Sequence, residues 1–173
     1  MKKIFLSVLI IFCAFFQLQA QNEKAWKTNT EAGVSIKCPE DWTNQKGLMG
    51  ITLFVASPLE SEKDVFSENV NLVIEDLQGM EMMIEEYVEF TKAQIEALIT
   101  NSKILKAEKI TFQEKDAYTM EYTGEQGKYK LHWKQIYFIE KGKAYILTYT
   151  AEGDKFAKYL LTADKIIQSF KYE

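Results

Sequence analysis

The chain has 173 residues, of which 47% are hydrophobic and 27% charged, with 21 basic against 25 acidic side chains. This composition excludes a disordered or collagen-like chain, and the length fits one domain that buries a sizeable core without disulfides or metal. All 21 basic residues are lysines. An acidic chain without arginine makes nucleic acid a poor partner, because arginine supplies the bidentate contacts of such interfaces.

Residues 1–20 predict a secretory signal peptide. Two lysines follow the initial methionine, residues 4–16 are apolar, and Ala20 is the small residue that precedes a cleavage site. The apolar run is too short to span a bilayer, which takes about 20 residues. We therefore expect cleavage after Ala20, export to the periplasm or the exterior, and one domain over residues 21–173 with no integral membrane span. An uncleaved anchor helix is the alternative.

The two cysteines are predicted to have no catalytic or cross-linking role. Cys13 lies within the apolar run and follows Phe12, whereas lipidation usually requires a small residue at that place, so a lipoprotein is the less favoured alternative. Cys38 is the cysteine that remains after cleavage, and it cannot form an intrachain disulfide. It follows an alternating stretch and is expected to be a small buried residue, with an interchain bridge or a reactive thiol as the alternatives.

Alternation of apolar and polar residues predicts a sheet. The strands are expected over residues 32–38, 51–57, 69–77, 104–112, 117–123, 128–140 and 143–150. Turns are expected over residues 39–41, 124–127 and 141–142. Trp42 follows the first turn and is predicted to return to the core. Residues 143–150 are apolar on both faces, which is typical of a strand in the middle of a covered sheet.

The apolar spacing changes to three and four over residues 81–99 and 154–170, which predicts two amphipathic helices. The first has an apolar stripe that includes Met83, Tyr87 and Leu98. Asp154 is the expected N-cap of the second. Short connections between strands favour an antiparallel sheet that the helices cover, so the pattern predicts an α+β fold.

Few residues in the sequence suggest catalysis or transition-metal binding. His132, the only histidine, shares a strand face with Lys130 and Lys134, so it is predicted to be an exposed structural residue and a poor base or zinc ligand. We find no nucleophile elbow and no phosphate-binding loop. We predict no cofactor and no tightly bound transition metal, so folding should be unaffected by a chelator.

Two groups of acidic residues are the remaining candidates for a cation site. Glu81, Glu85 and Glu89 recur along one face of the first predicted helix, where a solvated face is the simpler interpretation. The better candidate for weak Ca²⁺ binding is the loop of residues 58–68. It contains Glu60, Glu62, Asp64 and Glu68. This loop lacks the central glycine of a calcium loop, and a flexible acidic loop is the favoured interpretation.

Three segments resemble the PsbP-like superfamily, which contains the extrinsic PsbP subunit of photosystem II and many secreted bacterial proteins of unassigned function. Residues 33–42 (GVSIKCPEDW) resemble the family's opening, residues 64–72 (DVFSENVNL) precede the helix as in the family, and residues 166–170 (IIQSF) resemble its terminal helix. The resemblance implies an α-β-α sandwich with helices on both faces of a central antiparallel sheet. It implies no particular function. A photosynthetic role is not expected, because the N-terminus resembles a bacterial signal and not a thylakoid transit peptide.

These observations favour a secreted or periplasmic, non-enzymatic binding or accessory protein with an unknown protein or small-molecule partner in the cell envelope. A hydrolase that uses carboxylates in a cleft and a structural envelope component are the alternatives. Two carboxylates about 5–10 Å apart in a deep pocket would favour a glycosidase-like enzyme. An open and shallow surface would favour binding.

Overall fold

The computed structural model describes residues 25–173. The predictions for residues 1–20, including cleavage after Ala20 and the alternative at Cys13, lie outside the described residues. Within the described range no helix is long and apolar enough to cross a membrane.

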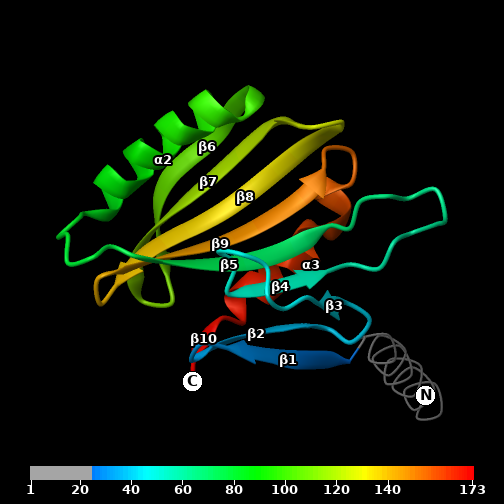
Figure 1. The fold of residues 1–173 in the computed structure, drawn as a ribbon, viewed down its shortest axis with the longest axis horizontal. Coiled ribbons are helices and arrows are strands. Elements are labelled where there is room, and N and C mark those ends of the chain that lie inside the picture. The colour runs from blue at the N-terminus through cyan, green and yellow to red at the C-terminus, as the bar shows by residue number, and fades with distance from the viewer. Residues whose placement is uncertain (1–24) are drawn as a thin grey trace, which may run out of the picture.

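Most of the described chain forms a seven-stranded antiparallel sheet in the order β3-β4-β5-β9-β8-β7-β6 (Figure 1). Its strands, in chain order, are β3 (Thr43–Asn44), β4 (Leu53–Ala56), β5 (Asn69–Asp76), β6 (Thr100–Phe112), β7 (Lys115–Gln126), β8 (Tyr129–Glu140) and β9 (Lys143–Glu152). As predicted from its doubly apolar pattern, β9 lies inside the sheet, between β5 and β8, and its residues 144–151 are all buried.

A second, smaller sheet has the order β1-β2-β10 and consists of β1 (Trp26–Glu31), β2 (Val34–Pro39) and β10 (Lys171–Tyr172). The terminal strand β10 pairs with β2, so distant parts of the chain lie side by side at the bottom of Figure 1. The sequence pattern did not predict β1 or β10. The two residues of β10 are too few to show a period, and their partner lies more than 130 positions earlier in the chain.

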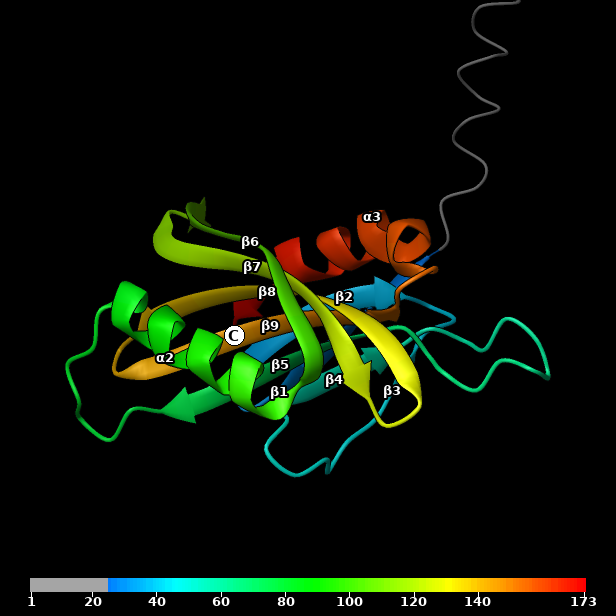
Figure 2. The same ribbon diagram turned by 90° about the horizontal axis from the view of Figure 1, so that it is seen from above.

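Two helices, α2 (Ile84–Leu98) and α3 (Phe156–Gln168), lie well apart from each other in Figure 2. They pack against separate clusters of core side chains. Alternate residues of β8 belong to different clusters: Trp133 and Tyr137 pack with α2, whereas Ile136 and Phe138 pack with α3. The predicted α+β class is therefore confirmed as a sheet-rich fold with two helices. The small sheet shares the core on the α3 side, which the prediction of one sheet did not include.

The predicted core positions of Trp42 and Cys38 are confirmed. Trp42 is 3% exposed, its N–H donates to the Pro39 carbonyl at 3.0 Å, and its ring meets that of Tyr159 edge to face at 6.3 Å. Cys38 is fully buried and accepts a hydrogen bond from the Asn29 amide at 3.2 Å. Burial raises the pKa of the Cys38 thiol, which keeps it in the unreactive neutral form.

Three local predictions were wrong. Lys155 occupies the N-cap of α3, and Asp154 lies in the preceding turn. β7 includes most of the expected turn at residues 124–127 and ends at Gln126, so the turn lies at residues 127–128. Met83 and Leu98, expected in the buried stripe of α2, are 63% and 80% exposed, because they stand at the two ends of the helix, beyond the sheet contacts of its middle turns.

Candidate functional site

The acidic segment of residues 58–68 folds onto the start of α3 through Lys155. The Lys155 Nζ lies 2.9 Å from Asp64 Oδ1, 3.2 Å from Glu152 Oε2 and 3.8 Å from Glu68 Oε1. The side chains of Asp64 and Glu68 are 6% and 0% exposed. We call Asp64, Glu68, Glu152 and Lys155 the Lys155 cluster. Its ammonium group lies between the carboxylates, in the position that a bound cation would need.

The environment shifts the pKa values of the cluster in different directions. The Glu60 N–H and then the Lys155 ammonium hydrogen-bond to Asp64 and lower the pKa of its carboxyl to about 2. Burial raises the pKa of Glu68, whose Oε1 accepts no hydrogen bond from any described residue. Burial alone would lower the pKa of Lys155, but hydrogen bonds to Asp64 and Glu152 and the charge of Glu68 outweigh it and raise this pKa.

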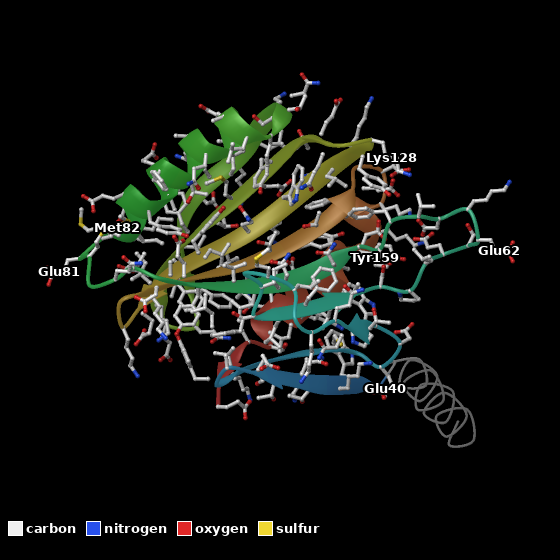
Figure 3. The ribbon with its side chains drawn as sticks, in the orientation of Figure 1. Glu40, Glu62, Glu81, Met82, Lys128 and Tyr159 are labelled. Carbon is white, nitrogen blue, oxygen red and sulfur yellow. The ribbon has the colours of Figure 1, made fainter. Side chains whose placement is uncertain are left out.

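The rest of the predicted calcium set does not converge on one point. Glu60 contacts Lys158 Nζ at 2.7 Å and accepts a hydrogen bond from the Tyr159 hydroxyl at 2.7 Å. Those contacts lower the pKa of Glu60. Glu62 is exposed at the far end of the loop (Figure 3). Among residues 25–173 no three or more histidine, cysteine or acidic side chains are arranged to hold a metal ion.

His132 is more enclosed than the sequence predicted, with 14% of its side chain exposed. Its ring stacks on Phe156 of α3 at a centroid distance of 3.5 Å, and its Nε2 lies 2.8 Å from Glu121 Oε1. The neighbouring Lys134 contacts Asp164 of α3 at 2.6 Å. The prediction of an exposed histidine was wrong because α3 packs over this face of β8, which the strand pattern could not reveal.

An open concave surface lies beside the N-terminus of α2. Two adjoining depressions of about 560 and 510 Å³ share Met82, Met83 and Ile139 in their walls. Met80 extends the wall, and Met80 and Met83 are 57% and 63% exposed. We call this surface the methionine depression; Figure 3 labels Met82 in the segment that leads into α2. Its volume falls in the range of small-ligand sites.

The backbone on both sides of the methionine segment is fixed by turns. Gln78 and Gly79 have φ values of 53° and 78°, and the Met80 N–H donates to the Leu77 carbonyl at 2.9 Å, which defines a type I′ turn. The Leu77 N–H donates to the carbonyl of Gly142 in the β8–β9 turn at 3.0 Å. At the other end, the Met83 N–H donates to the Glu86 carboxylate at 3.1 Å.

Acidic side chains predominate around the methionine depression. Glu85 and Asp116 lie 2.9 and 3.5 Å from Lys109 Nζ, which lowers the pKa of Glu85 through the hydrogen bond from Lys109. With Glu81 and Glu86 included, the walls contain four carboxylates and one ammonium group, that of Lys109. Such a surface favours positively charged ligands over anions. These methionines were not predicted as site residues, although three of the chain's six methionines occur within residues 80–83.

Comparisons with known proteins identify the class. The profile of the PsbP family matches residues 24–172, and the chain belongs to this family. The fold is similar to that of cyanobacterial PsbP (CyanoP) from Synechocystis sp. PCC 6803, with 17% identity, a TM-score of 0.59, and coverage of 88% of this chain and 95% of that one. The resemblance predicted from residues 33–42, 64–72 and 166–170 is therefore confirmed.

Two further structures share the fold. One is PA94 from Pseudomonas aeruginosa, a protein of unknown function described as a candidate regulator, with 14% identity, a TM-score of 0.62, and coverage of 83% of this chain and 94% of that one. The other is LpqN of Mycobacterium tuberculosis, which is involved in cell envelope biogenesis, with 10% identity, a TM-score of 0.60, and coverage of 88% and 92%. At these identities the likeness concerns the fold alone. No protein of curated function matches the chain.

Proposed function

We propose that this chain is an exported, non-enzymatic binding or accessory protein of the cell envelope, and that it binds its ligand at the methionine depression. One observation carries the proposal: the depression is open and Met80 and Met83 are exposed in it, whereas three of the four acidic residues of the predicted calcium loop lie against lysines. Methionine side chains are flexible and polarisable, and they are common on binding surfaces.

Export is supported by the signal-like residues 1–20 and by the envelope role of the structural neighbour LpqN. We further infer one domain over residues 21–173, and an α-β-α sandwich with α2 and α3 on opposite faces of the large sheet. The second inference follows because neighbouring residues of a strand point to opposite faces, and those of β8 pack with different helices.

The hydrolase alternative requires two carboxylates that can act on a bound substrate. Asp64 and Glu68 lie close together, but both are almost fully buried and both face Lys155. This arrangement resembles an internal ion cluster that fixes a loop more than a cleft that admits a substrate. It supports the binding proposal over the hydrolase.

A photo-crosslinking residue placed at Met83 tests the proposed function. Its matched control is the same residue at Leu161, which is 78% exposed on α3. In cells that export the protein, a protein ligand should give an adduct of defined mass from position 83 and none from position 161. Native mass spectrometry of the protein isolated from its own envelope, without a tag, detects a small-molecule or metal-ion ligand. Equal labelling at the two positions, together with an unliganded native mass, would contradict the proposal.

A further inference from the structure

We propose that Met80, Met82 and Met83 form a binding site for a soft monovalent cation, with Cu(I) as its biological ligand. The proposal rests on the proposed function and names the ligand of the same depression. All three side chains line one depression, and two of them are more than half exposed. The Met80 and Met83 thioethers therefore remain accessible in the folded protein, whereas Met82 is partly buried against the core cluster under α2.

The backbone places the three sulfur-bearing side chains within one short, anchored segment. The type I′ turn ends at Met80, and α2 begins directly after Met83, whose N–H is held by Glu86. The turn is tied in addition to the β8–β9 hairpin through Gly142. A segment that is fixed at both ends loses little further backbone freedom when a ligand binds, so the site is largely preorganised.

The ligand chemistry selects the metal. Thioether sulfur is a soft, neutral ligand that prefers Cu(I) to hard ions, which take oxygen ligands in larger number. A neutral ligand set leaves the positive charge of the ion uncompensated, and the carboxylates of Glu81, Glu85 and Glu86 supply negative charge in the walls. Glu85 and Glu86, in the first turn of α2, also offset the positive helix terminus.

The prediction of no tightly bound transition metal rested on imidazole, thiol and carboxylate ligands. Thioethers are a further class of soft ligand that it did not include. The prediction that folding does not depend on a metal is retained, because Met80 and Met83 are exposed and belong to neither core cluster, so a metal ion would bind after the chain has folded. Met49 provides the internal comparison: it is 99% exposed and lines neither depression.

Methyl NMR of the exported protein, labelled at the methionine methyl groups and titrated with Ag(I) as a redox-inert probe for Cu(I), tests the site. We expect the signals of Met80, Met82 and Met83 to shift together and to saturate near one equivalent, while the Met49 signal stays in place. Replacing all three methionines by leucine should weaken Cu(I) capture, measured anaerobically against bicinchoninate, by roughly tenfold or more, because the soft ligands are removed. Met49→Leu is the matched control.

Equal shifts at Met49 and in the segment of residues 80–83, or no shifts at all, would overturn the assignment. A thermal melt and the spectrum of the leucine variant check that its fold is intact, and the Ag(I) titration of the unchanged protein decides the question if that variant does not fold. The metal assignment fails separately from the proposed function: a position-83 adduct without Ag(I) binding leaves a binding protein with another ligand.

Discussion

The Lys155 cluster and the methionine depression differ in the exposure of their side chains: carboxylates are buried in the first, and methionines are exposed in the second. In the Lys155 cluster, the side chains of Asp64 and Glu68 are withdrawn from solvent and lie 2.9 and 3.8 Å from the ammonium of a lysine from another part of the chain. In the depression, Met80 and Met83 remain more than half exposed although burial would stabilise them. Charged residues thus serve the fold in the first region, whereas apolar side chains stay exposed in the second. The difference shows why the acidic residues of the sequence are a poor guide to the binding surface that we propose.

The largest effect is expected at Trp42, which supports the Lys155 side of the molecule through its contact with Tyr159. Trp42→Ala should lower the free energy of unfolding by about 3–5 kcal/mol, because it leaves a large cavity in the core. Urea unfolding measures this change. A loss below about 1 kcal/mol would mean that the ring contributes little to the core, and would reopen a ligand-binding role for it.

Lys155→Met tests whether the Lys155 cluster is structural. The substitution removes the cation while the carboxylates stay buried, and it should cost about 3 kcal/mol in the free energy of unfolding at neutral pH. Lys158→Met is the matched control, since that lysine is 59% exposed and pairs with Glu60 at the surface; such pairs contribute little. Equal effects of the two variants would show that the Lys155 cluster has no special role.

Glu68→Gln tests the same cluster through pH. Burial raises the folded-state pKa of Glu68, so its ionised form costs stability in the folded state. Near pH 4 the carboxyl is largely protonated in both states, and the variant should match the parent. As the pH rises through the folded-state pKa, the parent loses stability relative to the variant. The free energy of unfolding at pH 4 and pH 7 measures the difference, and Glu62→Gln at an exposed position is the control. A Glu68→Gln variant that is less stable than the parent at pH 7 would contradict the prediction.

The smallest effect is expected in the methionine depression. Met80→Gln and Met83→Gln should each change the free energy of unfolding by less than about 0.5 kcal/mol, because exposed side chains contribute little to stability. The same unfolding measurement applies. A loss above about 1 kcal/mol would place these side chains with the core and remove the contrast between the two regions.

Much of the fold was predictable from local pattern, and the candidate sites were not. The doubly apolar β9, the helical spacing of α2 and the position of Trp42 follow from period and turn residues that act over short stretches. The pairing of Lys155 with Asp64 is between residues 91 positions apart and depends on how α3 docks on the sheet. The three methionines are visible in the sequence, but their depression also needs Ile139 and Gly142 from the β8–β9 hairpin.

The small sheet has a consequence for the order of folding. Its central strand β2 has β1 as a neighbour nearby in sequence, whereas its other neighbour, β10, follows α3. Beside this pairing, the backbone N–H of Lys37 donates a hydrogen bond to the Ser169 hydroxyl, which joins residues 132 positions apart. Closing so long a loop costs conformational entropy, and this cost is offset only when the contacts of the core have formed. During synthesis, β2 therefore keeps an unpaired edge until α3 and β10 have emerged, and we expect the pairing of β2 with β10 to form late in folding.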